Sequence, residues 1–370
     1  MMRRVLALAV LAATALGPAP AVAAEPGAGV VVRAEALPRA LWVPGTGAAQ
    51  RVTYWSRTSE GKAAQSTGAV FVPAGTPPAG GWPVLSWAHG TVGLGDACAP
   101  STAGRSERDR TYLGTWLRQG YAVVATDYIG LGTPGVHAYL DGQAEANAVI
   151  DMVRAARATT PALARRWAAI GQSQGGGAAL FTAAKATRYA PELDYRGAVT
   201  TGPASNVTEF TALIGPYVPD IGLANLTAYL SYVLRGVKAA RPGFDLDSYL
   251  TPLGRQVMAD AERLCYADMA ARVKGIGIGQ LLSRPLLTGD YLKTAREVLD
   301  VPLTGYDRPL FIGQGTNDTD VPIFLTAKLT FDLSLRGQKF TYKTYPGKDH
   351  SATMAASLTD TIPFVRTLLG

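Results

Sequence analysis

Residues 167–177 read Trp167-Ala168-Ala169-Ile170-Gly171-Gln172-Ser173-Gln174-Gly175-Gly176-Gly177, and they give the strongest structural signal in this chain. The first half is a short apolar run typical of a buried strand, and the small residues after Ser173 predict a helix that starts at once. The centre fits the pattern G-x-S-x-G, in which small neighbours let a serine adopt a strained backbone at a sharp turn. Such a turn lifts the serine hydroxyl clear of the sheet and places helix N-terminal N–H groups beside it. The stretch therefore predicts a nucleophilic serine rather than an ordinary glycine-rich turn.

Short apolar strands and helical stretches alternate on both sides of this turn. The expected strands cover residues 51–57, 69–72, 83–88, 121–127, 167–171, 197–201, 309–313 and 339–345. The expected helices cover residues 106–119, 143–159, 174–187, 322–335 and 351–368. Alternation of this kind predicts an α/β fold with a mostly parallel central sheet and helices on both faces.

The alternation stops between residues 203 and 304, where the sequence predicts helices at 223–237, 248–264 and 291–299 and no strand. A helical insertion between two parallel strands predicts a cap over the carboxyl edge of the sheet, where open α/β sheets bind ligands. We therefore expect a core made of residues 25–202 and 305–370, with a cap or lid insertion at 203–304. The segment 223–230 could line an acyl tunnel or simply form the core of the cap.

A nucleophilic serine needs a base, and the chain has three histidines, namely His89, His137 and His350. In hydrolases built on this turn, the chain order is serine, then acid, then histidine. Only His350 follows Ser173, in the polar turn between the last expected strand and the last expected helix. His350 is therefore the predicted general base.

Two carboxylates compete for the third catalytic position, Asp318 and Asp320, since both follow the expected strand 309–313. In the arrangement G-x-x-D-x-x-V-P, the acid precedes the proline by four residues, which selects Asp318. Asp320 fits better as an N-cap or first-turn carboxylate of the helix entered through Pro322. Asp318 would hold the tautomer of the catalytic histidine and stabilise its imidazolium form.

An oxyanion hole needs two donors, and the first is the backbone N–H of Gln174, directly after the serine. The loop His89-Gly90-Thr91-Val92-Gly93 follows an early strand, where such hydrolases place the second donor, so we expect it near Thr91. His89 is predicted to be structural. His137 has no chemical partner that the sequence reveals, and a satisfied loop histidine is the simpler interpretation.

One motif suggests a different chemistry. Residues 130–135 fit G-x-G-x-x-G after a strand, and Asp151 lies about 20 residues further on, as in dinucleotide-binding proteins. In those proteins the motif itself opens the helix, whereas residues 136–140 intervene here, which argues against a nucleotide. There is no H-E-x-x-H pattern and no cysteine–histidine cluster, so no metal is indicated, and the expected chemistry needs no cofactor.

The N-terminus and the charge pattern predict where the protein works. Two arginines, an apolar run over residues 5–16 and the small-residue site at 21–24 predict a signal peptide, cleaved near Ala24, and a secreted protein. The formal charge is +7, but basic residues do not cluster, so nucleic acid binding is not expected. In an oxidising compartment the two cysteines, Cys98 and Cys265, usually pair.

Five segments together resemble the secretory lipases, which include the fungal lipase A enzymes. They are His89-Gly90-Thr91, Cys98-Ala99-Pro100-Ser101, Asp127-Tyr128-Ile129-Gly130-Leu131-Gly132, Gly171–Gly175 and Gly315-Thr316-Asn317-Asp318. The resemblance implies an α/β-hydrolase core with a helical cap after the sixth strand, acyl-ester substrates, and pairing of Cys98 with Cys265. Two features depart from the family. Fungal members place an aspartate in the oxyanion loop, a part that Asp96 or the Thr91 region takes here, and no cysteines remain for a second disulfide.

Together these patterns predict a secreted serine ester hydrolase, a lipase or carboxylesterase, with the triad Ser173, His350 and Asp318. An ester or lipid is the expected substrate, with transient contact to a lipid interface, and the expected state is a monomer. A triad peptidase, an acyltransferase and a non-catalytic binding protein on the same scaffold remain as alternatives.

Overall fold

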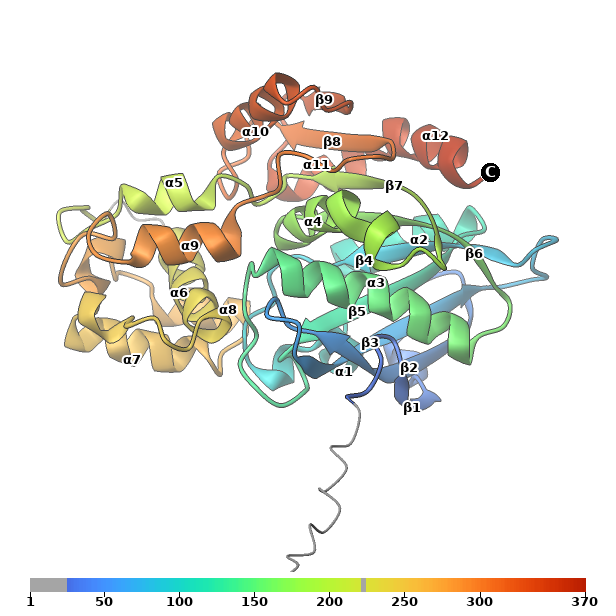
Figure 1. The fold of residues 1–370 in the computed structure, drawn as a ribbon, viewed down its shortest axis with the longest axis horizontal. Coiled ribbons are helices and arrows are strands. Elements are labelled where there is room, and N and C mark those ends of the chain that lie inside the picture. The colour runs from blue at the N-terminus through green and yellow to red at the C-terminus, as the bar shows by residue number, and fades with distance from the viewer. Residues whose placement is uncertain (1–24, 221–223) are drawn as a thin grey trace, which may run out of the picture.

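A computed structural model describes residues 25–220 and 224–370 of the chain, so the predicted signal peptide lies outside the described residues. Nine strands form one sheet in the order β1-β2-β3-β5-β4-β6-β7-β8-β9 (Figure 1). The strands are β1 (Val31–Ala36), β2 (Thr46–Arg57), β3 (Ala63–Pro73), β4 (Trp82–Ala88), β5 (Ala122–Ile129), β6 (Leu163–Gln172), β7 (Asp194–Thr201), β8 (Leu310–Gly315) and β9 (Thr341–Tyr345). Pairs from β1 to β5 along this order are antiparallel and those from β5 to β9 are parallel, which confirms the mostly parallel sheet.

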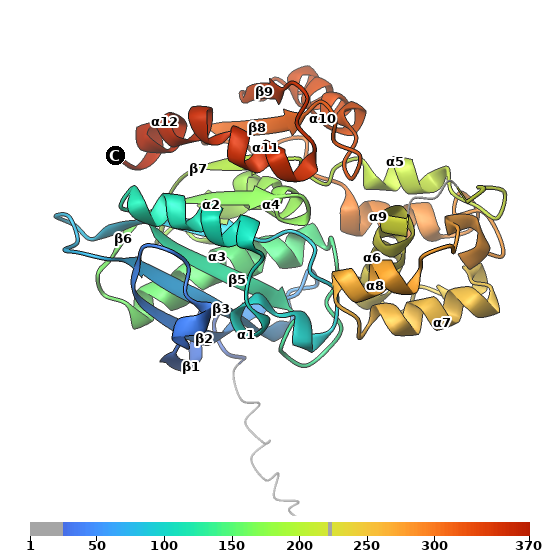
Figure 2. The same ribbon diagram turned by 180° about the vertical axis from the view of Figure 1, so that it is seen from behind.

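Helices cover both faces of this sheet. They are α1 (Pro100–Ala103), α2 (Glu107–Arg118), α3 (Gly142–Thr159), α4 (Gln174–Tyr189), α10 (Ile323–Leu335), α11 (His350–Ala356) and α12 (Leu358–Leu369). Helices α3 and α4 lie in front of the sheet in Figure 1, whereas α2, α11 and α12 come to the front in Figure 2. The predicted α/β fold with helices on both faces is therefore confirmed.

Side chains alternate between the two faces because a strand has a period of two residues. In β4, Val84 packs into the cluster under α3 and α4, and its neighbour Leu85 packs into the cluster under α2 and α12. Val124 and Val123 of β5 divide in the same way. The central strands are therefore apolar on both faces, which explains why they read as continuous hydrophobic runs.

Between β7 and β8 the chain forms helices and no strand in the described residues. The α-helices are α5 (Val207–Ala212), α6 (Ala224–Ala240), α7 (Pro252–Ala261), α8 (Tyr266–Arg272) and α9 (Tyr291–Leu299). They have a separate hydrophobic cluster of their own, centred on α6 residues such as Tyr232 and Leu234. Both views place these helices at one end of the sheet (Figures 1 and 2). The predicted boundaries of the insertion, residues 203 and 304, stay predictions. Its predicted role as a cap over the carboxyl edge of the sheet also stays a prediction.

Several elements differ from the sequence prediction, and the short helices α1, α5 and α8 were not predicted at all. Strand β1 was not predicted because it is an edge strand with largely exposed side chains and little apolar patterning. The expected helix 248–264 is two helical segments, since Pro252 starts α7 and the Thr251 hydroxyl caps it by accepting the Gly254 N–H. The expected last helix is likewise broken at Ser357, where α11 ends and α12 begins.

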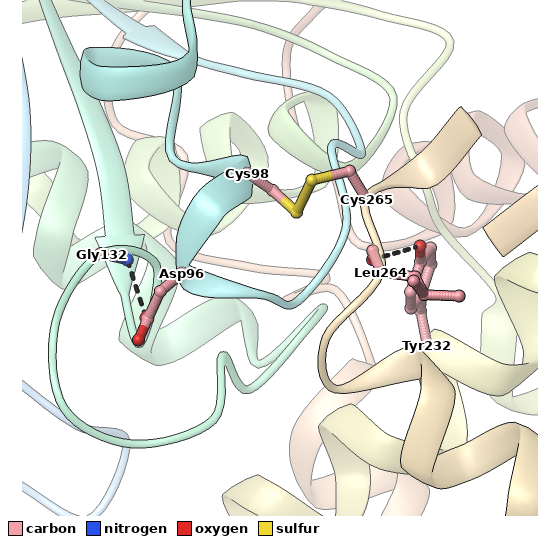
Figure 3. Close-up of a disulfide and its surroundings, with 6 residues drawn as sticks. All are labelled: Asp96, Cys98, Gly132, Tyr232, Leu264 and Cys265. Carbon is pink, nitrogen blue, oxygen red and sulfur yellow. Dashed lines mark hydrogen bonds between the residues drawn. A yellow bond between two sulfur atoms is a disulfide. The ribbon is translucent and has the colours of Figure 1, made fainter. Parts of the chain in front are cut away.

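A disulfide joins Cys98 to Cys265, with their Cα atoms 5.4 Å apart (Figure 3). Cys98 ends the 3-10 helix Asp96–Cys98 that follows β4, and Cys265 is the N-cap of α8. The link is reinforced by an isolated bridge between Gly93 and Cys265 and by the Tyr266 N–H, which donates to the Val92 carbonyl at 2.9 Å. The helical insertion is thus tied to the loop that carries Thr91. No helix in the described parts of the chain has the length and apolarity needed to cross a bilayer.

Candidate active site

The parallel strands bring the predicted site residues to one edge of the sheet. Strand β4 ends at Ala88 before the Thr91 loop, and β6 ends at Gln172 before Ser173. Strand β8 ends at Gly315 just before Asp318, and β9 precedes His350. Because carboxyl ends of parallel strands meet at the same edge, residues more than 250 positions apart in the chain become neighbours.

Ser173 has the strained backbone that the motif predicts. Its φ of 61° and ψ of −124° lie in a region that few non-glycine residues occupy, and it is the N-cap of α4. Its N–H donates to the Thr201 carbonyl of β7 at 3.0 Å, which anchors the turn on the sheet. A side chain at Gly171 would collide with the Gly175 backbone, and one at Gly175 with the Ala88 carbonyl. The two motif glycines are therefore required by the close approach of β4, β6 and α4.

His350 and Asp318 form a buried pair. The Nδ1 of His350 donates to Oδ2 of Asp318 at 2.7 Å. Gln314 donates to the same oxygen at 3.0 Å, while Oδ1 accepts the N–H groups of Asp320 and Val321 at 3.0 and 2.8 Å. Both carboxylate oxygens are therefore held by donors, which fixes the orientation of the imidazole ring.

Two details of this region differ from the sequence prediction. His350 is the first residue of α11 rather than a loop residue, because the Asp349 carboxylate caps that helix by accepting the Ala352 N–H. Asp320 is not a helix cap, since α10 begins after Pro322 without a side-chain cap. Asp318 takes the hydrogen bonds that organise this turn, and the Asp320 side chain lines the cavities beside Ser173 instead.

Ser173 and His350 line the same cleft, together with Gly90 and Thr91. The structure does not contain a hydrogen bond between the serine hydroxyl and the imidazole, and the buried Nε2 of His350 has no partner among the described residues. Since Nδ1 is occupied by Asp318, Nε2 is the nitrogen that can exchange a proton with the cleft. Such serine–histidine contacts are often loose in enzymes without a substrate.

Two cavities of different polarity meet at Ser173, and both are also lined by Tyr229 and Asp320. The first extends under the helical insertion and is mostly apolar, with Leu140, Val207, Phe210, Ile214, Leu226, Leu230, Val233 and Leu325 among its lining residues. The second is the cleft with His350, and it carries Arg105, Arg108, Asp109, Tyr266 and Ser351. The serine therefore has an apolar compartment on one side and a polar one on the other.

Both predicted oxyanion residues lie at this serine. Gln174 opens α4 directly after it, and Thr91 lines the cleft. The loop packs closely, since a Cβ on Gly90 would lie 3.5 Å from the Cβ of Ser173. Asp96, the other candidate for the oxyanion loop, accepts the Gly132 N–H at 3.0 Å instead (Figure 3). This contact favours the Thr91 region over Asp96.

The other two histidines are buried. His89 contacts the Gly90 carbonyl through Nδ1 at 2.7 Å, and burial lowers the pKa of its imidazole. His137 is a loop histidine whose two ring nitrogens both have partners, in agreement with the predicted satisfied loop histidine. Its Nδ1 donates to the Ile129 carbonyl at 3.0 Å, and its Nε2 lies 2.8 Å from Nε2 of Gln174. Glu145 also contacts the Gln174 amide, at 2.7 Å.

Three residues that surround the predicted site were not predicted from the sequence. They are Tyr139, Glu145 and Gln314. Of these, Gln314 had a usable signal, because a polar residue at the end of an apolar strand needs a buried partner. Tyr139 and Glu145 had none, since their contacts depend on how a loop folds over the sheet edge. The described residues contain no group of three or more His, Cys, Asp or Glu side chains that could hold a metal ion.

A strained serine between strand and helix, beside a His–Asp pair at the carboxyl edge of such a sheet, defines the α/β-hydrolase class. The comparison with protein families agrees with this class. The family model of the secretory lipases matches residues 100–367, which is more than half of the chain, and this protein belongs to that family.

Individual relatives are distant. Lipase A of Moesziomyces aphidis is 22% identical over 365 residues, which span 91% of this chain and 76% of the relative. A probable inactive lipase of Mycobacterium tuberculosis is 27% identical over 263 residues, which span 66% of this chain but 55% of the relative's length. The chain thus spans about half of that relative.

Solved structures share the fold at low sequence identity. Candida antarctica lipase A in its closed state has a TM-score of 0.72 at 20% identity, covering 92% of this chain and 82% of that one. The rice cell wall degrading esterase LipA from Xanthomonas oryzae has a TM-score of 0.74 at 19% identity, covering 93% and 99%. At these identities the likeness establishes the fold and leaves the substrate open.

Proposed function

We propose that this protein is a serine ester hydrolase, a lipase or carboxylesterase, with Ser173 as nucleophile, His350 as general base and Asp318 as the orienting acid. One observation carries the proposal. Ser173, with its strained backbone, lines the same cleft as His350. The Nδ1 of His350 is hydrogen-bonded to the buried Asp318 carboxylate, which leaves Nε2 for the serine. Membership of the secretory lipase family supports ester substrates.

The reaction proceeds by two acyl transfers. The Nε2 of His350 takes the proton of the Ser173 hydroxyl while Oγ bonds to the ester carbonyl carbon. The tetrahedral intermediate then expels the alcohol, which receives that proton from His350. In the second half, His350 deprotonates a water that attacks the acyl-enzyme, and the acid leaves as Ser173 regains its proton. Throughout, Asp318 stabilises the imidazolium.

The negative oxygen of each tetrahedral intermediate needs donors that are already in place. The backbone N–H groups of Gln174 and of the Thr91 region fill this role, since both flank Ser173. A helix N-terminus adds a favourable dipole at the Gln174 side. No cofactor takes part in these steps.

The two cavities suggest how an ester is held. The apolar cavity under α5 and α6 suits the acyl chain, because each methylene removed from water contributes about 0.8 kcal/mol. The polar cleft with His350 suits the alcohol group, which must receive a proton there. Of the predicted segment 223–230, residue 223 lies outside the described residues. The rest is then partly acyl-cavity wall, since Leu226, Tyr229 and Leu230 line the cavity.

The setting in which the enzyme works also belongs to the proposal. We expect a secreted monomer that meets ester or lipid substrates and touches lipid interfaces transiently, without a nucleic acid partner. The secretory family and the disulfide between Cys98 and Cys265 support export.

The test is hydrolysis of p-nitrophenyl esters from acetate to palmitate by the wild type and by Ser173→Ala. Turnover is expected in the wild type and should fall by about 10⁴-fold or more in the variant, as for other triad serines. The matched control is Ser86→Ala, because Ser86 is a buried serine of β4 that donates to the Val149 carbonyl. Equal turnover in wild type and Ser173→Ala would refute the proposal.

A non-catalytic role is the second candidate, because a relative carries the name of an inactive lipase and Nε2 of His350 has no partner among the described residues. It predicts folded protein with no turnover at any chain length and no reaction with a fluorophosphonate. A peptidase or an acyltransferase would react with the probe but prefer an amide substrate or an alcohol acceptor.

A further inference from the structure

We propose that the segment from His137 to Glu145 positions both sides of the oxyanion hole, with Tyr139 and Glu145 as its two positioning residues. This inference rests on the proposed function and adds to it two side chains that lie outside the triad. The segment links β5 to α3, and its contacts reach Thr91 on one side and Gln174 on the other.

On the first side, the segment holds the side chain of Gln174, whose backbone N–H is the first oxyanion donor. Its Nε2 amide donates to Oε1 of Glu145 at 2.7 Å and lies 2.8 Å from Nε2 of His137. Both hydrogens of the amide therefore have acceptors. All three side chains are buried, so these contacts do not compete with water.

On the second side, the segment holds the loop that supplies the other donor. The Tyr139 hydroxyl and the Thr91 hydroxyl are 2.6 Å apart. Burial keeps the pKa of Tyr139 well above its ordinary value, so the phenol stays protonated and can share its proton with Thr91. The same loop is fixed from its other end by the disulfide at Cys98 and by the Tyr266–Val92 hydrogen bond.

The backbone of the segment is built to reach these positions. Gly130 turns the chain at a φ of +82°, and a Cβ atom there would lie 2.6 Å from the backbone nitrogen of His137. Tyr128 has a φ of 69° and stacks on the His137 ring, with 5.5 Å between ring centroids. Leu140 has a φ of 61°, and its N–H donates to Oε1 of Glu145 at 3.0 Å. The glycine-rich motif at 130–135 thus provides the turn that brings the segment from His137 to Glu145 to the site.

Glu145 and His137 approach within 3.7 Å, but the geometry favours a neutral imidazole over an ion pair. Since the Gln174 amide nitrogen faces Nε2 of His137 and Nδ1 donates to a carbonyl, the imidazole carries a single proton. Burial lowers the pKa of His137 to about 3 and raises that of Glu145 to about 8. A neutral network holds Gln174 without placing a net charge behind the oxyanion.

The two polar groups, the Tyr139 hydroxyl and the Glu145 carboxyl, should therefore act on the transition state and leave substrate binding largely alone. Small displacements of catalytic groups cost up to about 100-fold in rate. We expect Tyr139→Phe to lower kcat about 10-fold and Glu145→Ala to lower it about 10- to 100-fold, with KM within about twofold in both. Glu145→Gln should restore most of kcat, because a carboxamide oxygen can accept the same two N–H groups.

The experiment measures kcat and KM for p-nitrophenyl butyrate with the wild type and the three variants, after thermal unfolding has shown that each is folded. Tyr249→Phe is the control for the lost phenol, since its hydroxyl donates to the Thr288 carbonyl within the helical insertion. Asp151→Asn is the control for the lost carboxylate, because Asp151 is buried on the same helix α3 and bonds Ser56 and Arg154. Neither control should change kcat by more than about twofold.

A selective loss of kcat in Tyr139→Phe and Glu145→Ala, with rescue by Glu145→Gln, is the expected result. Unchanged kcat in the folded Tyr139→Phe and Glu145→Ala proteins would overturn the inference and leave a Ser173-dependent esterase intact. A loss in Glu145→Ala that Glu145→Gln does not restore would overturn the positioning role of Glu145. Turnover that does not depend on Ser173 would instead remove the proposed function itself.

Discussion

At the residue scale, the site depends on which of two nearby carboxylates serves His350. Asp318 accepts the imidazole N–H at 2.7 Å and holds the turn through two backbone N–H groups. The Asp320 side chain instead lines the cavities beside Ser173. The four-residue spacing to Pro322 selects Asp318, and the hydrogen bonds support the same assignment.

This assignment predicts different losses for the two carboxylates. Asp318→Asn should lower kcat by about 10³- to 10⁴-fold, because an amide stabilises the wrong imidazole tautomer and cannot stabilise the imidazolium. Asp320→Asn should change kcat by less than about 10-fold, since its side chain only borders the cavities. Steady-state kinetics on one short ester would measure both. A larger loss in Asp320→Asn than in Asp318→Asn would reverse the assignment.

Glu145 gives a second prediction at this scale, in the pH dependence of stability. Burial raises its pKa from 4.5 to about 8, so the folded protein keeps a proton that the unfolded chain releases. The free energy of unfolding should therefore fall as the pH rises from about 4.5 to about 8, relative to Glu145→Gln. The groups facing Glu145 are Gln174, His137, Tyr128 and the nearby Asp141. Urea unfolding of the wild type and of Glu145→Gln at a series of pH values would measure this. The prediction is contradicted if the difference between their free energies of unfolding does not change with pH.

At the scale of elements, the sequence predicted the strands β4, β6 and β8 around the site well because each contains a short apolar run followed by a polar turn. Strand β1 escaped prediction because its valine run at residues 30–32 is short, is interrupted by Arg33 and lies on an exposed edge. Helix breaks at Pro252 and Ser357 were missed because apolar spacing continues across both. The contacts of Tyr139 and Glu145 were missed for another reason. They join a loop to residues far away in the chain, and no local pattern encodes that approach.

The disulfide belongs to this scale because it ties the 3-10 helix after β4 to α8. Replacing both cysteines by serine should lower the free energy of unfolding by about 2–5 kcal/mol, since the bridge closes a long loop. It should also lower kcat, because the Thr91 loop loses its covalent attachment to the helical insertion. Urea unfolding and ester hydrolysis measure these effects, and reducing the wild-type disulfide should reproduce them. An unchanged free energy of unfolding without the disulfide would show that the backbone pairing of residues 93 and 265 is enough to hold the loop on the insertion.

At the scale of the whole molecule, the core supplies the proposed catalytic groups and the helical insertion supplies most of the apolar cavity. Val207 and Leu226 come from the insertion, whereas Leu140 and Leu325 come from core segments. The sequence predicted the presence of an insertion from the absence of strands. It left open whether residues 223–230 face a cavity, because helical spacing alone does not distinguish a cavity wall from a packed interior.

This arrangement predicts that the insertion sets acyl chain length. Leu226→Trp should lower kcat/KM for long esters by about 10-fold or more and leave butyrate within about threefold, because the larger ring fills space that only a long chain needs. The matched control is Leu253→Trp, on α7, which does not line the cavity. A chain-length profile identical to the wild type would show that the acyl chain lies elsewhere.

The proposed mechanism depends above all on the activation of Ser173 by His350, and covalent trapping measures that activation without an ester substrate. The protein would be treated with a fluorophosphonate and digested, and the modified peptide would be identified by mass spectrometry. We expect modification of Ser173 in the wild type and Ser86→Ala proteins, strongly reduced modification in His350→Ala, and none in Ser173→Ala. A wild-type protein that is folded and remains unmodified, or is modified at another residue, would contradict this mechanism.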